Sequence, residues 1–341
     1  MGLMLVSGAA NTLLMKLMVG VSVPLGAGRE AAPFDHPYFQ TLLMMIGEFL
    51  CLLGFAATTT RQVRAKSAGV PVRIFALASA LDWAATTLVN MAYILIAASV
   101  VQMTRGAVVI FTCLLSTMLL GRRQHVHHLV GVGLVAFGIT LVSVSALVAP
   151  AAPAQGAEAT MSAASKLFGI ALCLIAQVFQ ALMLVYEENI LSQFEVPPLR
   201  VVGMEGLCGI GIGMFLLTGL NLSRVESTPA ALYQLGHSLP LAIAAVGSIF
   251  SVAVFNFSGV TVTQQASAVA RSTVDVSRTV LVWAVELAVG WNRFSMLQLT
   301  GFAVVAAGTL IYNRLISIRA LEPPEEASKL VAGEDPRGAA L

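Results

Sequence analysis

Residues 264–290, QQASAVARSTVDVSRTVLVWAVELAVG, decide the fold of this chain. The stretch is long and apolar enough to cross a bilayer as one helix, and its polar side chains fall within an arc of about 100°. An ionised side chain in the middle of a bilayer costs at least about 2.5 kcal/mol, so this face must meet other helices or a wet cavity. We therefore expect a helical bundle around it. The residues of the polar face are Gln264, Ser267, Arg271, Asp275, Arg278 and Glu286.

The composition indicates a membrane protein. Hydrophobic residues make up 57% of the chain and charged residues 11%, with a mean hydropathy of +0.86. An average soluble domain has about 25% charged residues. With spans of about 20 residues each, 341 residues leave room for roughly ten helices and little else. The net charge of +2 gives no sign of a nucleic-acid partner.

The apolar segments predict an all-α membrane protein with ten transmembrane helices in two inverted five-helix repeats. The first repeat is expected at 1–149 and the second at 166–318. Residues 150–165 are rich in Pro, Ala and Gly and predict a linker, and the polar residues 319–341 predict a disordered cytosolic tail. The predicted spans are 1–22, 37–60, 72–95, 98–120, 126–149, 166–193, 198–220, 238–259, 265–290 and 294–316.

The distribution of basic residues predicts that both termini lie in the cytosol. In this orientation eleven basic residues face the cytosol and four face the other side. The cytosolic ones are Arg61, Arg64, Lys66, Arg73, Arg122, Arg123, Arg200, Arg314, Arg319, Lys329 and Arg337. The others are Arg29, Lys166, Arg224 and Arg293.

Two matched segments indicate the repeat. Residues 90–105, NMAYILIAASVVQMTR, align without gaps on 256–271, NFSGVTVTQQASAVAR, with Asn at the start and Arg at the end of both. Two glycines seven residues apart then recur in the fifth and tenth spans. Because each half has an odd number of spans, the second copy is inverted in the membrane. The alternative is chance similarity between apolar helices.

The charged residues within the spans are the candidates for chemistry. Arg105 and its repeat mate Arg271 are expected near opposite mouths of one central cavity enclosed by the third, fourth, eighth and ninth spans. Asp82 is a possible partner for Arg105 or Lys16. Two interpretations of these charged residues are open. They could form structural ion pairs that hold helices together, or they could bind a solute or a proton.

The polar stripe itself predicts one surplus cation. If Asp275 pairs with Arg271 along their helix, Arg278 is left to meet Glu205, Glu48 or an anionic group of a solute. A carboxyl group at mid-membrane could also bind and release a proton, and Glu48 and Asp82 are the candidates. A neutral, hydrogen-bonded packing role for Glu48 is the alternative.

Other features predict structure rather than chemistry. The four cysteines lie in apolar runs and are expected to be buried thiols. The cluster of His125, His127 and His128 has no carboxylate or thiol beside it, which favours a solvated loop over a metal site. The glycines of the apolar segments are expected to let helices approach closely. These glycines are Gly131, Gly133, Gly138, Gly209, Gly213, Gly301 and Gly308.

Several motifs resemble the drug/metabolite transporter superfamily, within it solute carrier family 35, subgroup F, which is related to the chloroquine-resistance-type transporters. The motifs are SGxxNTxxxK at 7–16, HPxxQ at 36–40, GEF at 47–49, QMxRGAVVIFT at 102–112, LGRR at 120–123, YEEN at 186–189, PLRxxGxEG at 198–206, NFxGVxVT at 256–263 and ELAVGW at 286–291. The resemblance covers nearly the whole chain. It implies the same ten-helix inverted repeat and transport of small metabolites, in some branches nucleotide sugars, by alternating access.

The resemblance and the residues together give the expected function. We expect a secondary transporter of a small polar organic solute, nucleotide-sugar-like or proton-coupled, in an endomembrane such as the lysosome, vacuole or Golgi, with no enzyme activity, cofactor or metal. Its partners would be the solute, protons and membrane lipids, without nucleic acid. The alternative is a structural or regulatory membrane protein whose buried charges hold the bundle together. The candidate solute-binding residues are Asn11, Glu48, Asp82, Asn90, Gln102, Arg105, Gln177, Glu205, Asn256, Arg271, Asp275 and Arg278.

Two departures from the family pattern matter. The loop at 221–237 has no cysteine, so the disulfides that staple this loop in some relatives are absent. The tail sequence EEASKLV is a degenerate version of the acidic dileucine signal of lysosomal relatives, because Leu330 is followed by Val331.

Overall fold

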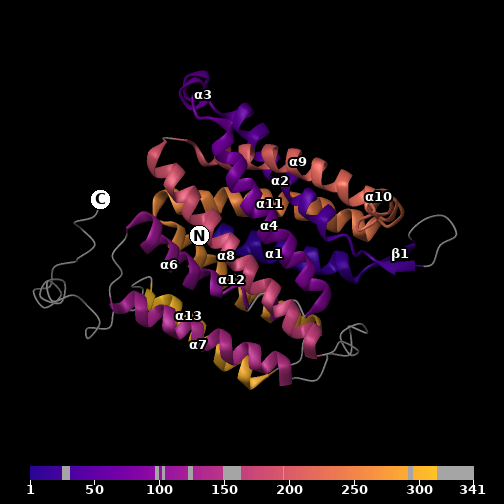
Figure 1. The fold of residues 1–341 in the computed structure, drawn as a ribbon, viewed down its shortest axis with the longest axis vertical. Coiled ribbons are helices and arrows are strands. Elements are labelled where there is room, and N and C mark those ends of the chain that lie inside the picture. The colour runs from indigo at the N-terminus through magenta and orange to yellow at the C-terminus, as the bar shows by residue number, and fades with distance from the viewer. Residues whose placement is uncertain are drawn as a thin grey trace, which may run out of the picture.

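The computed structural model describes a helical bundle (Figure 1). The described residues are 1–24, 31–96, 100–101, 104–121, 126–148, 163–194, 196–290 and 295–312. The predicted tail at 319–341 and most of the predicted linker lie outside them. The elements are α1 (Gly2–Gly20), β1 (Ser22–Pro24), β2 (Ala31–Pro33), α2 (Pro37–Thr58), α3 (Arg61–Ala68), α4 (Val72–Leu95), α6 (Ala107–Leu120), α7 (Val126–Val148), α8 (Ala163–Gln193), α9 (Pro198–Leu222), α10 (Thr228–His237), α11 (Leu239–Gln265), α12 (Ala268–Val289) and α13 (Met296–Tyr312).

The long helices match the predicted spans closely. The helix α4 begins and ends at the predicted residues, and α2 ends two residues before its predicted end. Within the described residues, α1, α2, α4, α8, α9 and α11 are long and apolar enough to cross a membrane. The chain is thus a helical membrane protein. The described helix of the fourth span, α6, begins at Ala107 rather than at residue 98, after a turn at Arg105 and Gly106.

The polar stretch at 264–290 does not form one helix. The helix α11 runs on to Gln265, and the chain breaks at Ala266 and Ser267 before α12 begins. Ser267 is extended, with φ −172° and ψ 166°, and its side chain accepts a hydrogen bond from the backbone N–H of Ala270. Such an N-cap stabilises a new helix start. The prediction that Gln264 and Ser267 belong to the polar face of the same helix as Arg271 is therefore wrong.

Four short elements, α3, β1, β2 and α10, were not predicted. The strands β1 and β2 form an antiparallel hairpin in which Val23 lies opposite Ala32. The helix α10 contacts this hairpin, and the Gln234 side chain donates to the carbonyls of Val23 and Ala32. Figure 1 places the hairpin and α10 together at one end of the bundle, away from α3. The all-helical prediction thus missed a small cap between the first and second spans.

Glycines allow two helix pairs to pack at close range. Going along α9, Gly203, Gly206, Gly209 and Gly213 lie against successively earlier residues of α2, so the two helices are antiparallel. A Cβ atom at Gly131 of α7 would lie 2.8 Å from the carbonyl oxygen of Gly308, and one at Gly138 would lie 2.8 Å from that of Gly301. The packing role expected for these glycines is confirmed, whereas Gly133 has open space around it.

The distribution of side chains is that of a protein in lipid. Large apolar side chains such as Phe215, Phe168 and Phe250 are exposed, whereas Glu187 and Glu286 are completely buried. A soluble protein would bury the first group and expose the second. The charged groups therefore lie inside the bundle, where they must find partners.

Candidate functional site

A small cavity lies in the middle of the bundle. Its walls come from α2, α4, α8, α11 and α12 and from the turn before α6, so the third, fourth, eighth and ninth predicted spans all contribute, as expected. The volume is about 40 Å³, which holds a few water molecules. An organic solute needs several hundred Å³, so the cavity must widen to admit one. The lining residues are Met44, Asp82, Thr86, Arg105, Gln180, Leu184, Val252, Phe255, Asn256, Arg271, Ser272 and Asp275.

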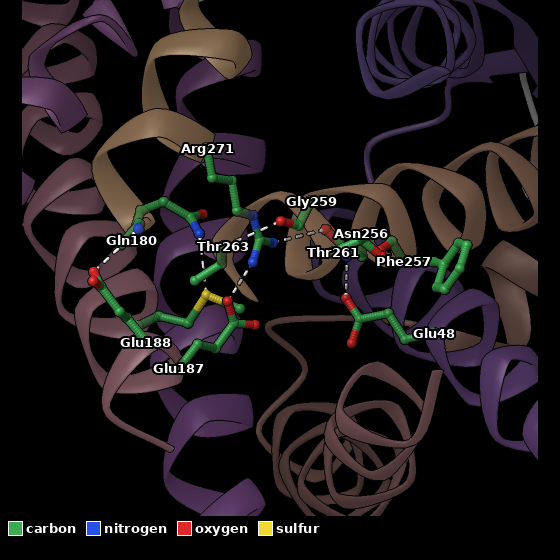
Figure 2. A network of polar contacts seen from close by, with 12 residues as sticks. Glu48, Gln180, Glu187, Glu188, Asn256, Phe257, Gly259, Thr261, Thr263 and Arg271 are labelled. Carbon is green, nitrogen blue, oxygen red and sulfur yellow. Dashed lines mark hydrogen bonds and ion pairs between the residues drawn. The ribbon is translucent and has the colours of Figure 1, made fainter. Parts of the chain in front are cut away.

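Arg271 connects this cavity to a network of buried polar groups (Figure 2). Its Nη1 forms an ion pair with Glu187 of α8, and its Nη2 donates to Asn256 Oδ1 of α11 at 3.4 Å. Asn256 in turn donates from Nδ2 to Glu48 Oε1 of α2 at 2.6 Å. A Cβ atom at Gly259 would lie 2.6 Å from Arg271 Nε, so only glycine leaves room for the guanidinium. Three helices, α8, α11 and α12, thus meet at Arg271, and α2 joins them through Asn256.

The carboxyl groups behind this wall are close to one another. Glu187 of α8 and Glu205 of α9 lie within hydrogen-bonding reach, and both are within electrostatic reach of Glu48 or Arg271. All three glutamates are buried, and none of them lines the cavity. The neighbouring Glu188 has a different role, because its Oε2 accepts the backbone N–H of Ala268 at 3.0 Å, at the start of α12. A carboxylate at this position stabilises the helix N-terminus.

Arg278 is not the surplus cation. Its Nε lies 3.0 Å from Asp275 Oδ1, although the pair is not aligned for a hydrogen bond. The guanidinium also lies over the Phe255 ring at 4.6 Å and donates to the carbonyl of Gly8 at 3.4 Å. The prediction that Asp275 pairs with Arg271 and leaves Arg278 over is therefore wrong. The cause is Glu187, which reaches Arg271 from another helix.

Asp82 was considered as a partner of Lys16, but Lys16 forms an ion pair with Glu286. Its Nζ lies 3.0 Å from Glu286 Oε1, a pair that joins α1 to α12 inside the bundle. Asp82 hydrogen-bonds Thr86 on its own helix and lies within electrostatic reach of Arg105 and Arg271. Because no ion pair joins it to a described cation, Asp82 is not the partner of Lys16 in this structure.

Arg105 is the cavity cation that is left without a partner. Among the described residues it is in no ion pair, and its buried Nε has no hydrogen-bond partner. Arg271 and Arg278 each face a carboxylate. A cation that lines a cavity and forms no direct ion pair is suited to contact an anionic group of a ligand.

The candidates that remain are Asn11, Asn90, Gln177 and Gln102. Asn11 accepts a hydrogen bond from Ser251 at 3.2 Å and joins α1 to α11, and Asn90 donates to Thr41 at 3.0 Å and joins α4 to α2. Gln177 donates to the carbonyl of Cys173 on its own helix. None of these three lines the cavity, whereas Asp82, Arg105, Asn256, Arg271 and Asp275 do. Gln102 lies outside the described residues.

Gln180, Ser272 and Glu187 were not predicted as parts of the site. Gln180 and Leu184 line the cavity, and Glu187 lies one turn further along the same face of α8. This spacing of four and then three residues could have been read from the sequence. Ser272 is adjacent to Arg271, and nothing in its local sequence distinguishes it.

No group of three or more metal-ligating side chains occurs among the residues that the structure describes. His127 and His128 lie 4.0 Å apart between ring centroids, and His128 also contacts Tyr312 at 4.7 Å. His125 lies outside the described residues. The described residues thus offer a polar cavity and a carboxyl cluster as the features with chemical potential.

Comparison with known proteins gives consistent matches over the whole bundle. A sequence model described as the UAA transporter family matches residues 34–316. Solute carrier family 35 member F6 of Homo sapiens is 33% identical, with 97% of this chain and 95% of that protein covered. The protein of the same name from Pongo abelii is 34% identical, with 92% and 88% covered.

More distant similarities extend to a fungus and to a solved structure. An uncharacterized protein of Schizosaccharomyces pombe is 29% identical, with 92% of this chain and 96% of that protein covered. A crystal structure superposes with a TM-score of 0.61 at 15% identity, covering 92% of this chain and 99% of that one. At such low identity the superposition shows the fold alone.

Proposed function

The chain belongs to the UAA transporter family, whose members are membrane transporters of small solutes, and from this premise we propose that it is a secondary active transporter. It would move a small polar organic solute across an endomembrane by alternating access. The observation that carries this proposal is the small cavity inside the bundle, whose wall includes the charged side chains of Arg105, Arg271 and Asp275. A protein with a purely structural role could pack this space solid.

The packing of the helices supports an inverted repeat as the basis of the movement. If α1, α2, α4, α6 and α7 correspond in order to α8, α9, α11, α12 and α13, the contacts of the two halves match. The helix α1 packs on α11 as α8 packs on α4, and α6 packs on α8 as α12 packs on α1. The mates α2 and α9 pack on each other, and so do α7 and α13.

The glycine contacts between α7 and α13 add a more detailed test of this symmetry. In the repeat, Gly131 corresponds to Gly301 and Gly138 to Gly308. The contact of Gly131 with Gly308 then becomes that of Gly301 with Gly138, which is the second contact observed. The two helices are also antiparallel, as mates related by a twofold axis in the membrane plane must be. We infer that the cavity lies near this axis and opens in turn to each side.

Arg105 is proposed as the anchor for an anionic group of the solute. It is a guanidinium in the cavity wall, where a planar pair of donors suits a carboxylate or a phosphate. The hydroxyl and amide groups of Thr86, Gln180 and Asn256 line the same space and can bind uncharged polar groups. The apolar side chains of Val252 and Phe255 complete the wall. This mixture fits a small polar organic molecule rather than a bare ion.

We place both termini on the cytosolic side, following the excess of basic residues in the loops on that side. This placement is supported by the position of the hairpin and α10 together at one end of the bundle, with α3 away from them (Figure 1). An endomembrane location is part of the proposal and rests on the similarity to the solute carrier relatives.

The proposal is tested by an uptake screen in proteoliposomes that contain the purified full-length chain. Labelled organic anions, zwitterions and nucleotide sugars are offered with and without a pH gradient, and empty liposomes are the control. We expect saturable uptake of one class of solute. Absence of uptake from the whole panel by well-folded protein would favour a structural role.

A further inference from the structure

Carboxyl groups outnumber cations behind the cavity wall. Around Glu187 lie Glu205 of α9, Glu48 of α2, Asp82 of α4 and Arg271 of α12, and Glu188 lies beside it on α8. Glu188 is occupied by the start of α12. Arg105, from the turn before α6, is within electrostatic reach of Asp82 but pairs with none of these groups. Two arginines therefore face four carboxyl groups in this region.

The ion pair between Arg271 and Glu187 indicates which carboxyl group of the cluster is ionised. Glu187 contacts the guanidinium of Arg271, so Glu187 is the ionised member. Glu205 contacts Glu187 and has no ion pair with a described cation. Two adjacent carboxylates out of water cannot both be ionised when one cation serves them, so they hold a proton between them. Among the described residues Glu187 Oε1 and Glu205 Oε1 are buried without a hydrogen-bond partner, so a proton on Glu205 would supply the donor that this pair lacks.

We propose that the Glu187–Glu205 pair is a proton-binding site whose occupancy depends on Arg271, and that it makes transport proton-coupled. The coupling part rests on the proposed function. Arg271 lines the cavity, whereas the two glutamates lie behind it. The guanidinium can therefore face either the solute or the pair, and a proton replaces it at the pair when it turns away.

The steps balance in charge. With Arg271 on Glu187, the pair carries one proton, and the pair with its arginine is neutral overall. When the anionic group anchored at Arg105 also attracts Arg271, which lines the same cavity, Glu187 loses its counter-charge in a region of low dielectric, where an isolated carboxylate is costly. An O–H bond then forms at Glu187, with a proton from the water of the cavity. The solute anion and the proton enter together, and the proton returns to water when Arg271 goes back to Glu187.

Asn256 keeps the movement of Arg271 short. Its Oδ1 accepts from the guanidinium at 3.4 Å while its Nδ2 donates to Glu48 at 2.6 Å. Figure 2 shows Arg271 between Glu187 and Asn256, with Glu48 beyond Asn256. Because Asn256 also lines the cavity, it can stay bonded to the arginine in both positions.

Infrared spectroscopy of the purified full-length protein tests the site without a solute, because the C=O band of a protonated carboxyl group is separate from the carboxylate bands. Wild-type protein at neutral pH should show a protonated-carboxyl band that weakens in Glu205→Gln, and this variant should remain folded because Gln resembles the neutral acid. Glu286→Gln is the matched control. Glu286 is equally buried but bonded to Lys16, so its substitution should leave the band unchanged.

Arg271→Gln imitates withdrawal of the guanidinium and should increase the band by one carboxyl group, whereas Arg271→Lys should leave it at the wild-type level. Melting curves identify any variant that fails to fold. If an Arg271 variant does not fold, the proton site is tested by comparing the band of Glu205→Gln with that of wild type. Absence of the band from wild type, or an unchanged band in Glu205→Gln, overturns the site. A folded Arg271→Gln with the wild-type band overturns the dependence on Arg271. If the uptake screen fails but the spectra are as predicted, the proposed transport is excluded and the proton-binding site still stands.

Discussion

Arg105 and Arg271 line the same cavity, but only Arg271 has an ion-pair partner among the described residues. In the proposed repeat the two are equivalent, each 15 residues after an asparagine, Asn90 in the first half and Asn256 in the second. Their surroundings differ, because Arg271 contacts Glu187 and Asn256 in this structure. Arg105 is the residue that we propose to anchor the solute.

Replacement of Arg105 should weaken solute binding without unfolding the protein. A charge-assisted hydrogen bond contributes about 1.5–3 kcal/mol, so Arg105→Gln should raise the KM for an anionic solute about 10- to 100-fold. Arg105→Lys keeps the charge but loses the planar fork, and a smaller increase is expected. The measurement is initial uptake in proteoliposomes, with Arg73→Gln on the exposed start of α4 as the control. An unchanged KM in folded Arg105→Gln would exclude the anchor role.

Lys16→Met should destabilise the bundle, because it takes the bonded cation away from the completely buried Glu286. Removal of one partner of a buried pair costs about 3–5 kcal/mol. The double variant Lys16→Met with Glu286→Gln should recover much of this loss, since no unpaired charge remains. Thermal unfolding in detergent measures both. Equal melting temperatures for wild type and Lys16→Met would contradict a stabilising pair.

Gly206→Ala should be strongly destabilising, whereas Gly211→Ala on the same helix should not. A Cβ atom at Gly206 would overlap the backbone of Glu48 and Phe49 on α2, and one at Gly211 meets nothing within 4 Å. Overpacking costs about 1–3 kcal/mol, while Gly to Ala in an open helical position gains up to about 1 kcal/mol. Melting temperatures of the two variants should therefore move in opposite directions. Similar shifts for both would argue against close packing of α2 on α9.

Asp35→Asn should raise the melting temperature at neutral pH but not in acid. Partial burial raises the pKa of Asp35 above its ordinary value of 3.8, and Glu226 raises it further, although His36 opposes this. The contribution of Asp35 to stability is therefore present below about pH 3.8 and is lost as the pH rises through the higher folded-state pKa. The side chain itself is exposed, so the effect should be small. A difference between variant and wild type that does not change between pH 4 and 7 would contradict this.

Periodicity and hydropathy predicted the long helices because a span must hide about 20 residues of backbone from lipid. They missed the break at Ser267, since a polar residue near a membrane surface looks the same in a continuous helix and at a new helix start. They also missed the hairpin at Val23, whose strands are too short to show a pattern. Local sequence therefore predicted the spans better than their ends.

The choice of ion-pair partners was beyond sequence reasoning. Arg271 can reach Asp275 one turn away on its own helix, but it pairs with Glu187, which is 84 residues distant along the chain. Spacing along one helix predicts only which groups can meet, and the packing of α8 on α12 decides which do. The surplus cation is predicted at Arg278, but in the part of the chain that the structure describes Arg278 faces Asp275 and Arg105 is the cavity arginine without an ion pair.

The most direct test of alternating access is the reaction of a cysteine in the cavity with membrane-impermeant thiol reagents. Ser272→Cys, in a chain whose four native cysteines are replaced by Ala, is treated from one face of sealed vesicles and then, in inverted vesicles, from the other. Ser192→Cys at the end of α8 and Ser223→Cys after α9 are exposed, and each should react from one face only, opposite to each other. We predict that Ser272→Cys reacts from both faces. If Ser272→Cys reacts from neither face while both controls react, a transport cavity is contradicted.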